Sequence, residues 1–251
     1  MRPLTASGLL LSPPMVVRFL LSLIFSILTA SAAFASGPVY DVVFDLDWTL
    51  FYPVKKLETT ETVQFGEEFY QPAEKAIEVL IKLHQDGHRV SLFSGGKAPR
   101  NQALANYLLN EIQTRGVRDF SFYKVLNFED LSRRDGASEG DKFAVRYAKD
   151  LTKINPDLSH VVLVDDLPEF AVSGQEKNMF GLGRTYAFHQ AYVPEAQGVY
   201  DPPNAQEWLR ERLKILHFYT QFSQVAQAPE PLTQLKALSQ GYGICSKVFS
   251  F

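Results

Sequence analysis

The sequence predicts an α/β fold of the Rossmann-like, doubly wound type, built on a mainly parallel sheet. Apolar, β-branched segments at 42–44, 89–93 and 160–164 have the composition of buried strands. Segments with helical periodicity separate them, and such regular alternation is typical of parallel sheets joined by helical crossovers. Carboxylates follow the first and the last of these segments, at the edge where open α/β sheets bind ligands. A functional site is therefore expected at that edge.

The first half of the chain divides into a strand, a flap, a helix and a second strand. After the strand at 42–44, residues 51–71 are polar and rich in Thr and Glu, with β-branched residues between them. This composition favours a small β-hairpin flap, and the segment is too short for a helical cap domain. Pro72 is typical of the first turn of a helix, which Gly87 then ends before the strand at 89–93.

The second half continues the alternation and then becomes irregular. The pattern predicts, in order, a helix over 99–113, a strand over 120–126, a surface loop over 127–140, a helix over 141–153 and a strand over 160–164. Beyond it, the pattern indicates a strand over 185–192, a proline-rich connection over 194–203 and a helix over 205–224. We expect one domain over 36–228, followed by a tail at 229–251 to which the sequence assigns no role.

Length and composition fit a single well-filled core. The chain has 251 residues, of which 46% are hydrophobic and 21% are charged, as in ordinary soluble domains. The formal net charge of −3 argues against nucleic-acid binding, which usually needs a basic excess or stripe. We therefore predict no nucleic-acid partner. The chain has one cysteine, Cys245, so no intrachain disulfide is expected.

The first 35 residues have the pattern of a secretory signal peptide. They contain two Arg and no Asp or Glu, an apolar stretch at 19–30, and a small-x-small cleavage pattern at Ala33-Phe34-Ala35. Translation starts at Met1, or at Met15 with a shorter charged region. The apolar stretch has about a dozen residues, fewer than the ~20 that span a bilayer. We therefore predict cleavage after 1–35, export across the inner membrane into the periplasm, and no stable membrane anchor.

Polar side chains directly follow three of the predicted strands. Asp45 and Asp47 follow the first strand, Ser94 follows the second, and Asp165 and Asp166 follow the last. The carboxyl ends of parallel strands meet at one edge of the sheet, so we expect these side chains to lie close together. Carboxylates are the ligands that Mg²⁺ prefers, and they also serve as nucleophiles and general acids. The pattern therefore predicts an enzyme that uses a hard metal ion.

This set of residues resembles the four motifs of the haloacid dehalogenase superfamily, which occur in the same order. The resemblance covers about 40–169 and includes a lysine before the last strand. Residues 149–168 are most similar to the branch of the C-terminal-domain phosphatases and their NLI-interacting-factor-like relatives. That branch has Arg-Pro-Gly where this chain has Gln71-Pro72-Ala73, and Asn where it has Asp166. The resemblance implies a phosphatase with no cap, or with only the small flap.

The resemblance also implies a role for each carboxylate. Mg²⁺ would be held by Asp45 and Asp166, with the backbone carbonyl of Asp47 and support from Asp165. Asp45 would attack phosphorus and form an aspartyl-phosphate. Asp47 would act as general acid toward the leaving oxygen and then as general base for water.

Three further residues complete the implied site. Thr49 would orient the loop, Ser94 would hydrogen-bond a phosphoryl oxygen, and a lysine would neutralise developing charge. Lys149 has the sixteen-residue spacing to Asp165 that the phosphatase branch shows, whereas Lys142 has the longer spacing common elsewhere in the superfamily. Both lie on the helix predicted over 141–153, and we favour Lys149.

The predicted function is a secreted, Mg²⁺-dependent phosphatase that hydrolyses phosphate monoesters. Without a large cap, an open site leaves space for a phosphorylated macromolecule as substrate. Two alternatives stay open: a catalytically silent relative that only binds its ligand, and a broad periplasmic acid phosphatase or nucleotidase. A silent relative would commonly lack Asp45 or Asp47, and both residues are present.

Overall fold

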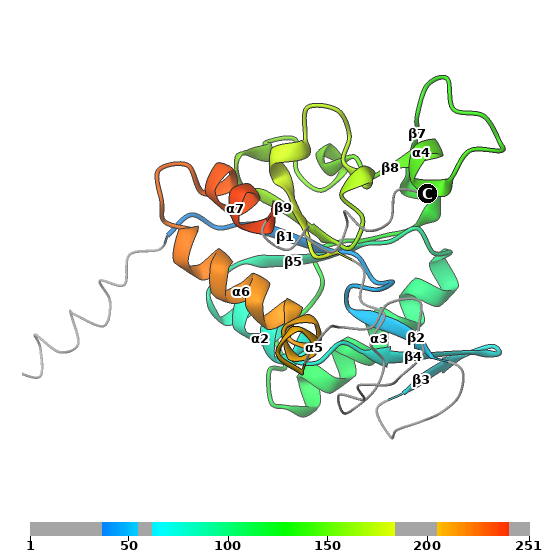
Figure 1. The fold of residues 1–251 in the computed structure, drawn as a ribbon. Coiled ribbons are helices and arrows are strands. Elements are labelled where there is room, and N and C mark those ends of the chain that lie inside the picture. The colour runs from blue at the N-terminus through cyan, green and yellow to red at the C-terminus, as the bar shows by residue number, and fades with distance from the viewer. Residues whose placement is uncertain (1–36, 55–61, 184–204, 241–251) are drawn as a thin grey trace, which may run out of the picture. The chain divides into compact units, whose positions relative to one another are not determined.

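The computed structural model describes residues 37–54, 62–183 and 205–240. At its centre lies a five-stranded sheet with the order β10-β9-β1-β5-β6, in which every neighbouring pair is parallel (Figure 1). The strands are β1 (Asp41–Phe44), β5 (Arg89–Phe93), β6 (Val125–Leu126), β9 (Val161–Asp165) and β10 (Met179–Gly181). The predicted α/β fold with a parallel sheet is confirmed.

Strands β1 and β9 form the buried centre of the sheet. All residues of both strands are buried, which explains their nearly continuous apolar, β-branched sequences. The two strands run in register, with Phe44 opposite Val164. The next residues along the chain, Asp45 and Asp165, are therefore brought to the same edge of the sheet.

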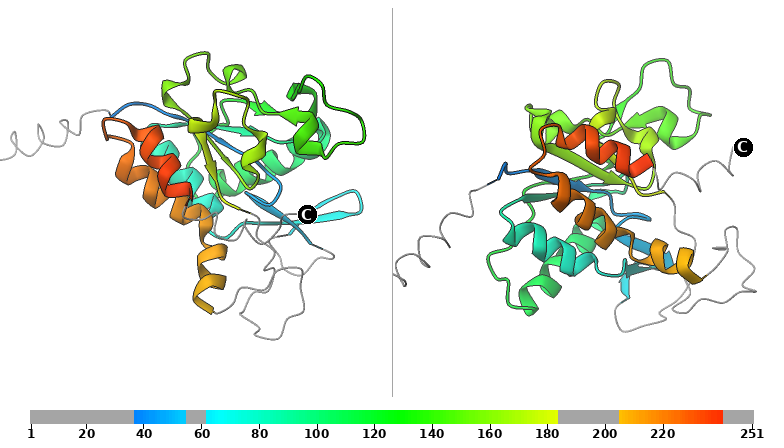
Figure 2. Two further views of the ribbon diagram at one scale, coloured as in Figure 1. Left: turned by 45° about the horizontal axis from the view of Figure 1, so that its top comes forward. Right: turned by 60° about the vertical axis from the view of Figure 1, so that its left-hand side comes forward.

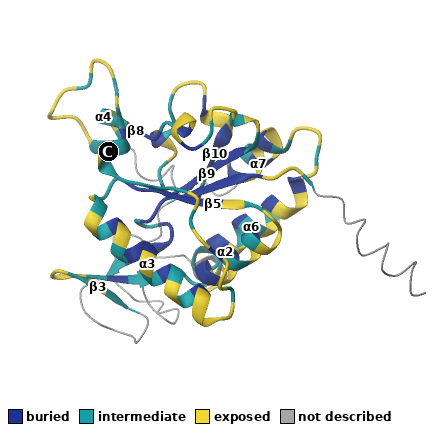
Figure 3. Ribbon diagram, turned by 180° about the vertical axis from the view of Figure 1, so that it is seen from behind, coloured by how far each residue is buried: buried dark blue, intermediate teal, exposed yellow. Residues whose placement is uncertain are grey.

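Longer helices cover one face of the sheet, and shorter elements cover the other (Figures 1 and 2). The first face is covered by α2 (Ala76–Gln85), α3 (Ala98–Thr114) and α6 (Lys214–Val225). There Phe44 and Phe218 are fully buried in one hydrophobic cluster. On the other face, Val43 and Leu163 belong to a second cluster with residues of short helical turns. Strands β5, β9 and β10 are accordingly drawn as largely buried in Figure 3.

Between β1 and α2 the chain forms a separate antiparallel sheet with the strand order β2-β4-β3. Its strands are β2 (Phe51–Val54), β3 (Val63–Phe65) and β4 (Glu68–Pro72). Gly66, in the left-handed region at φ 61°, makes the tight turn between β3 and β4. The flap predicted over 51–71 is thus β-structure, but it has three strands instead of a single hairpin.

The start of the first helix differs from its prediction. Pro72 is the last residue of β4 and pairs with Phe51, so it does not open a helix. The chain then passes through Lys75 in the left-handed region, at φ 64°, and α2 begins at Ala76. Pairing with the flap therefore overrides the local helix signal of the proline.

The prediction of a helix over 141–153 is wrong. Only α4 (Phe143–Arg146) is α-helical in this stretch. The chain then becomes extended, and β8 (Tyr147–Ala148) pairs with β7 (Ser132–Arg133), inside the region predicted to be a loop. The Lys149 N–H donates to the carbonyl oxygen of Phe170 at 2.9 Å. Backbone pairing with distant segments replaces the bonds that a helix would make.

Two strand predictions also need correction. Of the strand predicted over 120–126, only Val125–Leu126 is assigned as a strand, and it pairs with β5. The edge strand β10, which has three residues, was not predicted because it is too short to show a periodic pattern. The strand predicted over 185–192 and the connection over 194–203 lie outside the described residues.

The C-terminal part contributes to the packed fold. The helix predicted over 205–224 is divided at Leu213 into α5 (Ala205–Arg212) and α6. The segment predicted as a tail contains α7 (Pro231–Gln240), which packs against α6 and β10 and buries Leu232 and Leu235. At least this part of the tail is therefore structural.

The predicted signal peptide, at 1–35, lies outside the described residues. Within the three described ranges, the structure has no helix that is both long and apolar enough to cross a bilayer. The prediction of export therefore depends on the sequence pattern alone.

Candidate active site

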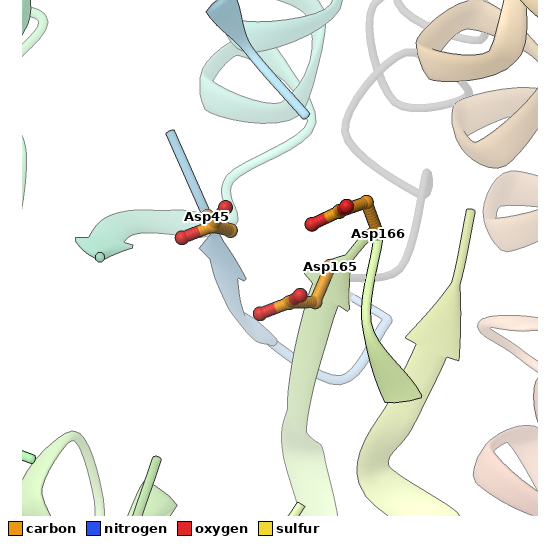
Figure 4. A group of neighbouring side chains, drawn as sticks. All are labelled: Asp45, Asp165 and Asp166. Carbon is orange, nitrogen blue, oxygen red and sulfur yellow. The ribbon is translucent and has the colours of Figure 1, made fainter. Parts of the chain in front are cut away.

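Three carboxylates converge where β1 and β9 end (Figure 4). One oxygen atom from each of Asp45, Asp165 and Asp166 lies within 4.8 Å of the other two, and all three residues are buried. The backbone N–H of Asp45 donates to the carbonyl oxygen of Val164 at 3.0 Å, which extends the pairing of the two strands by one residue. The strand ends therefore determine where these carboxylates lie.

Lys149 joins the two strand ends as a buried cation. Its Nζ donates to Oδ1 of Asp45 and to Oδ2 of Asp165, both at 2.6 Å, and only 1% of its side chain is exposed. Lys142 is exposed, directly before α4. The structure thus places Lys149 at the carboxylates and Lys142 outside the site.

Burial and charge shift the protonation equilibria of this cluster. Burial acts to lower the pKa of Lys149, but the carboxylates of Asp165 and Asp45 outweigh it and raise that pKa above its ordinary value. Burial raises the pKa of Asp45; Lys149 opposes this shift, and the carboxylates of Asp165, Asp47 and Asp166 add to it. The carboxylates of Asp45, Asp165 and Asp166 repel one another, and a divalent cation among them would relieve that repulsion.

The donor set fits a hard divalent cation such as Mg²⁺. Its three clustered groups are all carboxylates, which are the ligands that Mg²⁺ prefers. Asp165 already accepts from Lys149 and, at 2.8 Å, from the N–H of Leu167, which suits a supporting role. Asp47 was predicted to contribute its backbone carbonyl to the metal site; its side chain lies outside this cluster and pairs with Arg100.

The carboxylate of Asp47 is held by two other elements. Ser94 directly follows β5, is fully buried, and donates from Oγ to Asp47 Oδ2 at 3.2 Å. Arg100, in the first turn of α3, donates from Nη1 to Oδ1 at 2.9 Å and from Nη2 to Oδ2 at 2.5 Å. The structure thus brings two predicted residues together and adds an arginine that was not predicted.

The loop after β1 is bent at Trp48, which has a φ of 61° that bulky residues rarely adopt. Lys214, from α6, donates from Nζ to the Trp48 carbonyl oxygen at 2.6 Å and to that of Gly183 at 3.2 Å. Burial lowers the pKa of Lys214 to about 8, against the opposing effect of nearby acids, led by Asp166. Thr49 is fully buried, and its hydroxyl has no hydrogen-bond partner within the described ranges.

Arg100 and Lys214 were not predicted, although each has a local signal. Arg100 lies six residues after Ser94, at the start of a helix that begins beside the functional edge of the sheet. Lys214 lies four residues before Phe218 and eight before Phe222, so it shares the buried face of α6. A cation in register with an apolar helical face is the signal that could have identified Lys214.

The sequence profile of the NLI interacting factor-like phosphatases matches residues 40–186. The matched region is more than half of the chain and contains every site residue described above except Lys214. The chain belongs to this family. It is therefore a phosphatase of the haloacid dehalogenase type, and the resemblance of its four motifs is confirmed.

Solved structures that resemble this family member include the RNA polymerase II CTD phosphatase Fcp1. A fission yeast Fcp1 variant bound to beryllium fluoride is 13% identical, with a TM-score of 0.42, and the match covers 91% of this chain and 68% of that one. Another Fcp1 structure is 15% identical, with a TM-score of 0.43 and coverage of 84% and 63%. A comparison with curated proteins gives no match.

Replacing Lys149 by Met is expected to lower the free energy of unfolding by about 3–5 kcal/mol in EDTA, because buried carboxylates lose their counter-charge. Urea denaturation followed by circular dichroism measures the change. Lys142→Met removes an exposed lysine and is the matched control, with an expected change of no more than about 0.5 kcal/mol. Equal effects of the two substitutions would contradict the burial of Lys149 between the carboxylates.

Proposed function

We propose that this phosphatase is an exported, Mg²⁺-dependent enzyme that hydrolyses phosphate monoesters through an aspartyl-phosphate on Asp45. One observation carries the proposal: buried carboxylates meet Lys149 at the carboxyl ends of β1 and β9. Family membership supplies the reaction class. The N-terminal sequence pattern supports export.

The site neutralises charge before a carboxylate attacks a phosphate dianion. Asp45 and Asp166, with the backbone carbonyl of Asp47, would hold Mg²⁺, which supplies positive charge that offsets the phosphoryl oxygens. Lys149 orients the Asp45 carboxylate through its 2.6 Å bond to Oδ1 and contributes a second positive charge. Ser94, which donates from Oγ to Asp47 Oδ2 without substrate, would turn that hydrogen to a phosphoryl oxygen when substrate binds.

Two displacements at phosphorus complete the proposed reaction. In the first, an oxygen of Asp45 bonds to phosphorus as the ester P–O bond breaks, and the leaving oxygen takes a proton from Asp47. In the second, Asp47 takes a proton from water, and the water oxygen bonds to phosphorus as the bond to Asp45 breaks. The products are an alcohol, inorganic phosphate and the free carboxylate of Asp45, with Asp47 protonated again.

Phosphorylated macromolecules are the substrate class that we propose. The described insertion between β1 and α2 consists of three short strands, which is a small cover compared with a helical cap domain. A panel with a phosphopeptide, a nucleoside monophosphate and a sugar phosphate separates this class from a broad acid phosphatase or nucleotidase. The highest kcat/KM should belong to the phosphopeptide, and a preference for the nucleotide would contradict the proposal.

Asp45→Asn is expected to reduce the release of p-nitrophenol from p-nitrophenyl phosphate by at least about 10³-fold, because it removes the nucleophile. Wild-type activity is expected to require Mg²⁺ and to disappear in EDTA. Asp135→Asn, an exposed substitution of the same type, is the matched control and should keep full activity. Activity in Asp45→Asn would exclude this nucleophile, and a wild type that hydrolyses no phosphomonoester would favour a silent binding protein.

Export is tested by expressing the full chain in a Gram-negative host and sequencing the N-terminus of the protein in the periplasmic fraction. Cleavage after Ala35 should give a chain that begins at Ser36. A variant without residues 1–35 is the control and should stay in the cytoplasm. Recovery of the uncleaved full chain from the cytoplasm would contradict the proposed export.

A further inference from the structure

The guanidinium of Arg100 is engaged by protein groups on every nitrogen. Besides its two bonds to Asp47, Nη1 lies 3.5 Å from the Tyr70 hydroxyl, and Nη2 lies 3.3 Å from Ser94 Oγ. Asn101 Oδ1 accepts from Nε at 3.3 Å and from Nη2 at 3.0 Å. The side chain of Arg100 is 16% exposed, whereas that of Asp47 is 30% exposed. The arginine is therefore the inner partner of this ion pair, and the carboxylate is the more accessible one.

The turn after β5 is shaped around this guanidinium. A Cβ added to Gly96 would lie 2.0 Å from Nη2 and 2.4 Å from Cζ of Arg100, so glycine is required for the close approach. Asn101 is fully buried, and its Nδ2 donates to the Gly96 carbonyl oxygen at 2.9 Å and to Asn127 Oδ1 at 3.1 Å. These bonds turn Asn101 Oδ1 toward the arginine.

Arg100 also contacts the flap. Its Cζ lies 5.5 Å from the centre of the Tyr70 ring, and Tyr70 is 2% exposed. The Tyr70 hydroxyl donates to Glu68 Oε2 at 2.5 Å, within the same strand, β4. The guanidinium is thus held between the flap, the turn after β5 and its own helix. Its two bonds to Asp47 therefore restrict the orientation of that carboxylate.

We propose that Arg100 is a positioning residue that fixes the orientation of the Asp47 carboxylate and does not itself bind the substrate. The inference rests on the proposed function, in which Asp47 transfers protons. Two parallel bonds from a planar fork fix both the place and the plane of a carboxylate. In the described arrangement the guanidinium's N–H groups are already used by the protein, which leaves none directed at a phosphoryl oxygen.

The position of a general acid matters most when the leaving oxygen is strongly basic. An alkyl phosphate such as glycerol 2-phosphate needs a proton on its leaving oxygen, whereas p-nitrophenolate leaves readily without one. The ratio kcat/KM reports the first displacement, before the water step that Asp47 also serves. Arg100→Gln is therefore expected to lower kcat/KM for glycerol 2-phosphate by about 10²-fold and kcat/KM for p-nitrophenyl phosphate by less than about 3-fold.

Two further variants separate the effect of the guanidinium's two-bond geometry from the effect of its positive charge, and a third is a control. Arg100→Lys keeps the charge without the fork and should behave as Arg100→Gln does. Gly96→Ala keeps the arginine but displaces its guanidinium, so it should show the same dependence on the leaving group. Arg115→Gln removes a more exposed arginine at the other end of the same helix and should match the wild type on both substrates. Full activity in Arg100→Lys would overturn the role of the fork.

A crystal structure of Arg100→Gln gives a result that does not depend on activity. The Asp47 carboxylate should leave its place beside Ser94, and an unmoved carboxylate would overturn the proposal. Equal losses of kcat/KM on both phosphates, with a raised KM, would instead show that Arg100 binds the substrate. If the carboxylate moves but the wild type hydrolyses neither phosphate, the proposed function fails while the positioning of Asp47 by Arg100 stands.

Discussion

One buried bridge supports the rest of the site: Lys149 Nζ joins Asp45 and Asp165 at the ends of two adjacent parallel strands. Carboxylates that are close together and shielded from water repel each other, and desolvation adds to the cost of keeping them ionised. Lys149 offsets both effects, so β1 and β9 can end side by side in acidic residues. The same cation that makes this burial tolerable also orients Asp45, which links the stability of the sheet edge to its chemistry.

Two more cations, Arg100 and Lys214, contact the loop that follows β1. Arg100 holds the carboxylate of Asp47, and Lys214 holds the backbone of Trp48 between Asp47 and Thr49. The three cations come from separate segments of the chain, and each contacts β1 or the loop that follows it. Lys214 belongs to α6, which lies beyond residues 40–186, the part of the chain that matches the family profile. The C-terminal helix α6 therefore contributes directly to the shape of the loop after β1.

The sequence predicted the centre of the fold well because buried parallel strands have continuous apolar sequences, as in β1 and β9. It also predicted which carboxylates follow those strands. It failed where long-range contacts decide the local structure. Lys149 lies on an extended segment whose backbone bonds to Phe170, and no local pattern reveals that pairing. Arg100 and Lys214 were missed because basic residues on helices are usually solvated. Only tertiary packing buries Lys214 and shields most of Arg100 from solvent.

The most direct test is to trap the phosphoryl group on the protein. The wild type is mixed rapidly with substrate and Mg²⁺, quenched, and reduced with sodium borohydride, which converts an aspartyl-phosphate to homoserine. Mass spectrometry of the peptides then locates the reduced residue. We expect homoserine in place of Asp45 and at no other carboxylate. Homoserine elsewhere, or release of phosphate without any reducible acyl-phosphate on Asp45, would contradict its role as the nucleophile.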